Sequence, residues 1–413
     1  MRRVLLVAAC LLMVLGFATA AHSQEAPVPS ATTDETALTP SGVSTGWSAR
    51  VDTSGDLFGI GWRGDPDSTF TIETVEDEAW TAPQEVRAMG DDTGPDPGAP
   101  EGATVASVQH GTEPVWSGDA SAVRVTLTSG SATDVELVTI SVDTPAADST
   151  SDEAALGVGG VGALTFAAAG IGPAVRRRRE VATLLAVGLA LASVAFVADR
   201  ADAAGGHKVP APPHLVGRKA WGAESPQCNP GTFNKVRFGI VHHTAGANSY
   251  NNGDGPGIVK GIQQYHMHGP FNPPYCDIAY NFLVDKYGHS YVGRAGSRRT
   301  HNPIFGAHTS GHNKGSFGVS ILGNYQSAPF TSSAKQPLSD VIAWRFLAWD
   351  INPLGTTVSI SAGGASHWPA GTHVPTNTIT GHRDWNSTEC PGNNVYNRMA
   401  GIRKGVAKRM GIT

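Results

Sequence analysis

Histidine and cysteine, the residues that most often bind transition metals, gather in the C-terminal half of this 413-residue chain. Thirteen of the 15 histidines lie at or beyond His207. His242 opens an HHTAG motif, and His382 precedes Cys390 by eight positions around a loop. A catalytic zinc site uses three such ligands and leaves a fourth position to water. We therefore predict a zinc (Zn2+) site formed by His242, His382 and Cys390.

Zinc held in this way would activate water and polarise an amide carbonyl, which is the chemistry of a hydrolase. Taken one at a time, however, the motifs are weak, because His-His pairs are more often structural and Cys-Pro pairs are common. A closed structural zinc site is an alternative that needs a fourth ligand. His243, more simply a packing residue, is the one neighbour that could supply it. If Cys390 binds metal, Cys228 and Cys276 remain to form a disulfide.

The elements that must position these ligands alternate between strands and helices. Apolar runs predict strands over 236–241, 277–285 and 316–322, and helical spacing predicts helices from Ile258 and over 338–349. The first of these strands leads directly into His242. We therefore predict an α/β domain over 206–413, in which helices flank a mixed β-sheet.

Six sequence blocks occur in order between Arg218 and Arg403: VHHTAG, QQYHMHGP, CDIAYNFLVDKYG, VGRAG, GAHTSGHNKGSFGVSILGNY and GHRDWNSTECPG. They resemble the family of peptidoglycan recognition proteins and type-2 N-acetylmuramoyl-L-alanine amidases, in its actinobacterial form. This resemblance implies zinc-dependent hydrolysis of the amide bond between N-acetylmuramic acid and L-alanine in peptidoglycan. The alternative is a non-catalytic peptidoglycan-binding module. Such members typically lack the cysteine ligand, whereas Cys390 is present here.

The resemblance also implies roles for other residues. Tyr280 and Thr388 are the predicted catalytic residues beside the metal. The predicted substrate-binding residues are His308, Asn313 and Arg294. Arg294 belongs to a GRAG segment that departs from patterns known to select the third stem residue, so diaminopimelate versus lysine stays open. No glutamate occupies an obvious general-base position.

Charge divides the chain into two halves. Residues 206–413 carry 19 Lys and Arg against 8 Asp and Glu, whereas the rest carries 11 against 27. A basic half suits an anionic polymer such as a bacterial wall. Nothing in the sequence indicates nucleic-acid binding or a particular oligomeric state.

The N-terminal part begins with a predicted signal peptide over 1–20, where two arginines precede an apolar run and an Ala-Thr-Ala site. Residues 21–44, rich in Ser, Thr and Pro, are predicted to be a disordered leader. Alternating apolar residues and turn motifs predict an antiparallel β-sandwich over 45–145, with its tryptophans in the core. Its GIGW and GTEPVW motifs loosely resemble an accessory domain that precedes the amidase in many actinobacterial family members.

The segment 146–205 is predicted to be a linker with two uncharged stretches, 154–175 and 181–198, on either side of four arginines. Each stretch is near the roughly 20 residues that span a bilayer. A membrane hairpin with the arginines inside would leave both domains outside the cell. A disordered Ala/Gly linker and an internal signal peptide ending at Ala203 are the alternatives. The protein is thus predicted to be exported, either free or anchored at the cell surface.

Overall fold

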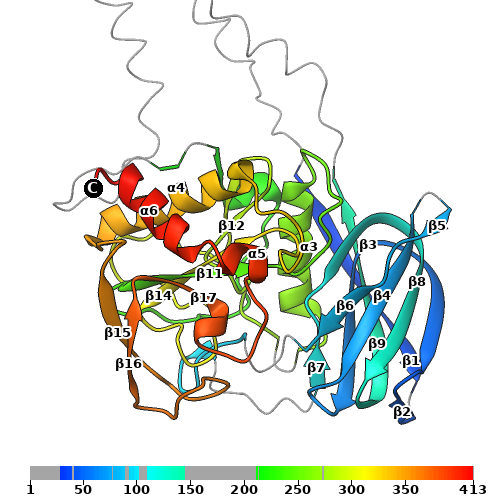
Figure 1. The fold of residues 1–413 in the computed structure, drawn as a ribbon. Helices are drawn as coiled ribbons and strands as arrows, with labels where there is room; N and C mark the ends of the chain where they lie inside the picture. Colours follow the sequence, from blue (N-terminus) through cyan, green and yellow to red (C-terminus); the bar gives the residue numbers. More distant parts are fainter. Residues whose placement is uncertain are drawn as a thin grey trace, which may run out of the picture.

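The computed structural model describes residues 28–39, 41–76, 78–88, 93–101, 109–144, 211–212, 214–271 and 274–412. These residues form an all-β part up to residue 144 and an α/β part from residue 211 onward (Figure 1). The predicted signal peptide and the predicted membrane hairpin lie outside the described residues. Within the described ranges, no helix has the length and apolar character needed to cross a bilayer.

The α/β part is built on a six-stranded mixed sheet with the order β10-β13-β12-β14-β11-β17. These strands are β10 (Leu215–Val216), β11 (Phe238–His243), β12 (Phe282–Val284), β13 (Ser290–Val292), β14 (Ser316–Ile321) and β17 (Ile379–Gly381). The helices are α3 (Gly255–His268), α4 (Ser332–Trp349), α5 (Asn393–Tyr396) and α6 (Met399–Arg409), with 3₁₀ turns η2 (Arg218–Trp221) and η3 (His382–Asp384). A separate hairpin joins β15 (Thr356–Ile360) to β16 (His373–Asn377).

Helices cover both faces of this sheet, as the sequence predicts. Successive strand residues point to opposite faces. On β12, Phe282 and Val284 pack in the core cluster with α4 and α6, whereas Leu283 packs with α3 on the other face. Helix α4 starts earlier than the predicted 338–349, because Thr331 caps its first turn by accepting the amide of Ala334 at 3.3 Å.

The N-terminal part forms a nine-stranded antiparallel sheet. Its strands are β1 (Ser30–Thr39), β2 (Val43–Ser44), β3 (Ser48–Gly64), β4 (Thr69–Glu76), β5 (Ala79–Trp80), β6 (Gln84–Arg87), β7 (Gln109–Gly111), β8 (Val115–Ser129) and β9 (Ser131–Asp143). The all-β prediction holds, but hydrogen bonds join the strands into one sheet instead of the two sheets of a sandwich. Register shifts along the long β3–β8 pair let this sheet bend. Trp62 and Trp116 are buried, whereas Trp80 is partly exposed beneath the Arg124 guanidinium.

The prediction of a disordered leader over 21–44 is wrong for residues 30–39, which form β1. This strand pairs antiparallel with β9. Its small side chains face α3, where Ala31 packs in a shared apolar cluster and Thr33 Oγ1 accepts a hydrogen bond from Gln264 at 3.0 Å. The polar composition of this segment is typical of disorder. An edge strand such as β1, however, needs little more than backbone pairing with β9 and small side chains that fit against α3.

Helix α3 joins the two parts, because it also packs on β1, β3 and β9 of the N-terminal sheet (Figure 1). Glycines permit the close approach: a Cβ at Gly261 would lie 2.3 Å from Leu57, and one at Gly59 would lie 2.3 Å from Tyr265. Leu57, Val138 and Ile140 of the N-terminal sheet share one core cluster with the α3 side chains. The two parts therefore pack through a continuous apolar core.

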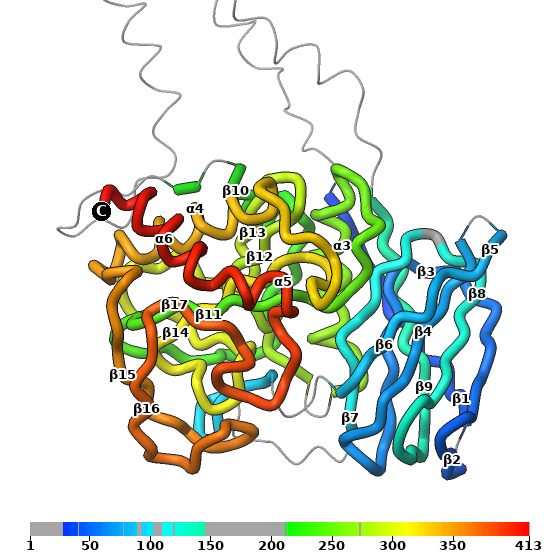
Figure 2. The backbone as a smooth tube through the Cα atoms, viewed as in Figure 1, coloured from blue at the N-terminus to red at the C-terminus, as the bar shows by residue number. Residues whose placement is uncertain are grey.

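A second connection is residues 93–101, here called the strap, which leaves the N-terminal sheet and runs along the α/β part (cyan beneath β14 and β17 in Figure 2). The amide of Gly94 donates to the carbonyl of Ala307 at 2.7 Å, and Ala99 is buried in the α4–α6 core cluster. The strap brings two acidic side chains, Asp96 and Glu101, into the α/β part, where both are buried.

Candidate active site

His242 and His382 stand at the carboxyl ends of two neighbouring parallel strands. β11 pairs with β17 so that Val241 lies opposite Gly381, and the next residue of each strand is a histidine. Their ring centroids are 4.5 Å apart. Cys390 arrives from the loop after η3, with its Sγ 3.6 Å from His242 Nδ1. One potential ligand atom from each of the three residues lies within 4.8 Å of the others.

These donors fit a zinc ion. Zinc–nitrogen bonds of about 2.1 Å and zinc–sulfur bonds of about 2.3 Å at tetrahedral angles separate the two donors by about 3.6 Å. The distance between Nδ1 and Sγ agrees with that spacing. Burial, and then the neighbouring His382 and His308, hold the pKa of His242 well below its ordinary value. The imidazole is therefore neutral, which is the form that binds metal.

Arg383 fixes the loop that carries Cys390. Its amide donates to the Cys390 carbonyl at 3.0 Å, and its guanidinium donates to the carbonyl of Glu389. The Cys390 sulfur accepts the backbone N–H of His243 at 3.4 Å, which holds it at the carboxyl end of β11. The His243 ring faces elsewhere, and its Nδ1 accepts the amide of Tyr325 at 3.0 Å. His243 thus has the surroundings of a packing residue.

The metal-ligand cluster opens into a cleft of about 910 Å³ between the two parts of the chain. Tyr280, His382, Thr388 and Cys390 line one side. The opposite side comes from the N-terminal sheet, including Ile72, Thr74, Gln84, Glu85, Val86 and Glu113. The structure thus brings the predicted catalytic residues together with the ligands, and the N-terminal sheet adds a second side to the cleft that the sequence does not predict.

His308 and Asn313, the predicted substrate-binding residues, are fully buried behind the cluster and do not line the cleft that the described residues form. His308 Nδ1 lies 3.1 Å from His242 Nε2. A histidine that binds metal through Nδ1 can donate its Nε2–H in this way. Asn313 Oδ1 accepts the His308 amide at 2.9 Å, and its Nδ2 donates to Asp96 of the strap at 2.9 Å. In this structure both residues support His242 from behind.

Gly318 on β14 provides the space that His308 needs. A Cβ at this position would lie 2.6 Å from two atoms of the His308 ring. We expect Gly318→Ala to displace His308 and to weaken zinc binding about 10- to 100-fold, the usual effect of losing a residue that orients a metal ligand. Gly217→Ala is the matched control, because a Cβ at Gly217 meets no atom within 4 Å. Competition with a chromophoric chelator measures the affinity, and equal affinities for the two variants would contradict the assignment.

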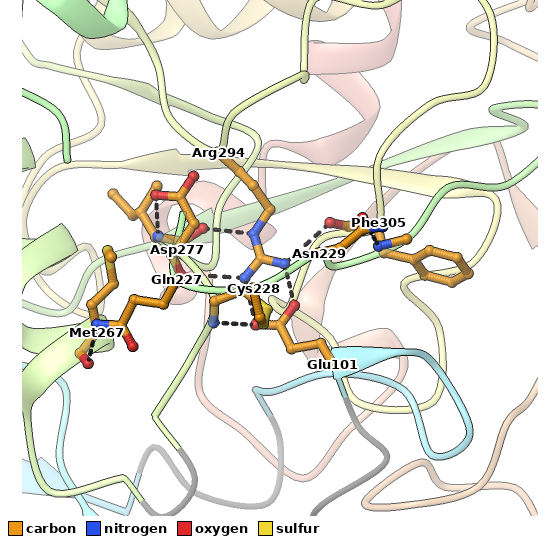
Figure 3. Close-up of a disulfide and its surroundings, with 11 residues drawn as sticks. Glu101, Gln227, Cys228, Asn229, Met267, Asp277, Arg294 and Phe305 are labelled. Atoms are coloured by element: carbon orange, nitrogen blue, oxygen red, sulfur yellow. Dashed lines mark hydrogen bonds and ion pairs between the residues drawn. A yellow bond between two sulfur atoms is a disulfide. The ribbon is translucent and has the colours of Figure 1, made fainter. Parts of the chain in front are cut away.

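Arg294, the third predicted substrate-binding residue, is fully buried away from the cleft. Its guanidinium donates to Glu101 of the strap at 2.5 and 3.0 Å (Figure 3). Burial by itself would lower the pKa of Arg294, but the Glu101 carboxylate raises it, so the side chain stays charged. The predicted disulfide between Cys228 and Cys276 is present, and the Cys276 amide donates to the same carboxylate at 2.7 Å. The substrate contact predicted for Arg294 is corrected to an ion pair that fastens the strap.

His266, on α3, is buried and uncharged. Its Nδ1 accepts the amide of Ala279 at 3.1 Å. Burial, and to a smaller extent the charge of Arg294, lowers the pKa of His266 to about 3. In the unfolded chain the same group binds its proton near pH 6.5. The stability that His266 contributes is therefore complete above about pH 6.5 and is lost as the pH falls toward 3.

We expect His266→Asn to reduce this pH dependence, because asparagine keeps an acceptor near the Nδ1 position and does not titrate. Between about pH 6 and 4, the slope of the unfolding free energy against pH should fall by about 1.4 kcal/mol per pH unit relative to the wild type. Denaturant titrations at several pH values measure both slopes. Parallel slopes would show that His266 binds a proton equally well in the folded state.

Comparisons with known proteins identify a family model and several relatives that are similar to this chain. The family model described as N-acetylmuramoyl-L-alanine amidase matches residues 232–393. The chain is 30% identical over 189 residues to peptidoglycan-recognition protein SC2 of Drosophila simulans, covering 45% of this chain and 84% of that protein. It is 29% identical over 188 residues to peptidoglycan recognition protein 1 of Bos indicus, covering 44% of this chain and 80% of that protein. The solved structure of wild-type Drosophila PGRP-LB aligns with 22% identity and a TM-score of 0.35, covering 45% of this chain and 92% of that one.

Proposed function

We propose that this chain, which belongs to the family of peptidoglycan recognition proteins and type-2 N-acetylmuramoyl-L-alanine amidases, is a zinc-dependent peptidoglycan amidase. Its substrate would be the amide bond between N-acetylmuramic acid and L-alanine. The observation that carries the proposal is the convergence of His242, His382 and Cys390 at one side of the cleft. Export, predicted from residues 1–20, would bring the protein to this polymer.

The residues around the cluster suit hydrolysis of an amide. Bound zinc would supply an activated water and would polarise the scissile carbonyl. Tyr280 lies beside His242, with ring centroids 5.4 Å apart. Its hydroxyl can orient the attacking water or stabilise the oxygen that gains charge. The Thr388 hydroxyl accepts the Cys390 amide at 3.3 Å, so its own proton remains available to a substrate oxygen.

A non-catalytic peptidoglycan-binding module is the second candidate. Structures of relatives include human PGRP-IBETAC in complex with glycosamyl muramyl pentapeptide, so a family member can hold a peptidoglycan fragment. Three potential metal donors within 4.8 Å of one another favour the enzyme, because a cleft that only binds gains nothing from a cysteine and two histidines that converge beside it.

Incubation of the full chain with a soluble muropeptide separates the two candidates. An amidase releases a peptide with a new amino terminus on L-alanine and a sugar with a free lactyl carboxylate, both visible by mass spectrometry. Recovery of intact muropeptide, bound to the protein, would support the binding module and refute the amidase.

A further inference from the structure

We propose that the N-terminal sheet completes the catalytic site by supplying Glu113 as the residue that positions Tyr280. This inference rests on the proposed amidase function and assigns a part of it to a residue outside the α/β part. Glu113 lies in the turn between β7 and β8. Its Oε1 accepts a hydrogen bond from the Tyr280 hydroxyl at 2.8 Å.

Both side chains face the cleft that holds the metal-ligand cluster. Glu113 and Tyr280 line this cleft together with His382 and Cys390. The Tyr280 ring also packs beside the His242 ring. The Glu113 side chain therefore touches an aromatic residue that lines the cleft beside the ligand His242, at a distance typical of an O–H···O hydrogen bond.

The backbone around Glu113 is held firmly in place. The Thr112 amide donates to the Ile60 carbonyl at 3.0 Å, and the Thr112 hydroxyl accepts the Ile60 amide at 3.1 Å. Pro114 follows directly and restricts the chain on the other side. Because the backbone of this turn is fixed, the Glu113 carboxylate can hold the Tyr280 hydroxyl in one orientation.

The hydrogen bond decides which role Tyr280 can play. A phenol has one proton. When that proton is donated to Glu113, the Tyr280 oxygen is left as an acceptor on its remaining side. It can then accept a hydrogen bond from the attacking water and aim the water's lone pair at the carbonyl carbon. Glu113 thus makes Tyr280 a residue that orients water instead of a donor to the developing oxyanion.

The test is a double-mutant cycle in the full chain, with kcat and KM measured on a soluble muropeptide. Glu113→Ala should lower kcat about tenfold or more and leave KM unchanged, the effect expected for a lost hydrogen bond to a charged group. Glu113→Gln should recover most of that loss, because its amide oxygen still accepts the phenol proton. In a Tyr280→Phe background, Glu113→Ala should have no further effect on kcat.

Thr33→Val is the matched control, since it also removes one hydrogen bond between the N-terminal sheet and the α/β part, to Gln264, and neither residue lines the cleft. It should leave kcat and KM unchanged. Thermal melting of every variant shows whether it folds. If Glu113→Ala fails to fold, Glu113→Asp, with a carboxylate one methylene shorter, replaces it in the cycle.

Three results would overturn the inference. They are an unchanged kcat in Glu113→Ala, a rise in KM alone, and equal losses from Glu113→Ala with and without the Tyr280 hydroxyl. The failure of the proposed function looks different, because the wild type itself would then release no product. A wild type that is active and sensitive to chelators, with Glu113→Ala matching it, refutes the role of Glu113 and leaves the amidase standing.

Discussion

Cys390→Ser is expected to lower the rate of muropeptide hydrolysis by about a thousandfold or more. A serine hydroxyl is a poor zinc ligand, and the metal supplies several kcal/mol of transition-state stabilisation. His382→Ala should have the same effect, because it removes a second ligand from the same cluster. Initial rates followed by mass spectrometry, with zinc content measured on the same samples, check both variants.

His373→Ala is the matched control, since it removes an exposed histidine on β16. It should keep the wild-type rate and the wild-type zinc content. Wild-type rates in Cys390→Ser would refute a catalytic role for the cluster. If the two ligand variants instead unfold while the control does not, the zinc site is structural.

The second large effect concerns stability. Glu101→Ala leaves the guanidinium of Arg294 fully buried without its carboxylate partner, and both side chains of the pair are almost completely shielded from water. Breaking a buried pair from one side costs about 3–5 kcal/mol, because the remaining charge is not compensated. Denaturant unfolding of the full chain should show a loss of this size.

Two further variants show whether the cost comes from the buried charge. Combining Glu101→Ala with Arg294→Met removes both charges, so much of the lost stability should return. Glu85→Ala breaks an exposed pair with Arg87 and should cost less than about 1 kcal/mol. A loss in Glu101→Ala as small as that in Glu85→Ala would mean that the strap is not fastened by this ion pair.

The metal-ligand cluster could be predicted from the sequence because its residues are chemically unusual and follow recognisable strands. His242 ends an apolar run, and His382 and Cys390 share a short loop. Parallel pairing of β11 and β17 then brings the two histidines together. The fold class of the α/β part follows from the same alternation of strands and helices.

The contacts between the two parts could not be predicted in this way. The family resemblance, through the GRAG segment, predicts a substrate-binding role for Arg294, but its partner lies 193 positions earlier in a turn-rich segment. Glu113 is in the GTEPVW motif, which resembles an accessory domain of the family, but no spacing rule connects it with Tyr280. The strap brings Glu101 to Arg294, and the packing of the N-terminal sheet on α3 brings Glu113 to Tyr280.

The most direct test of the zinc amidase is digestion of purified peptidoglycan by the full chain, first with a chelator and then after zinc is restored. The account predicts stem peptides with a free L-alanine amino terminus from the untreated protein, none in the presence of the chelator, and renewed release when zinc is added. Undiminished release from protein shown to contain no metal would contradict it, as would tight wall binding with no release under any of the three conditions.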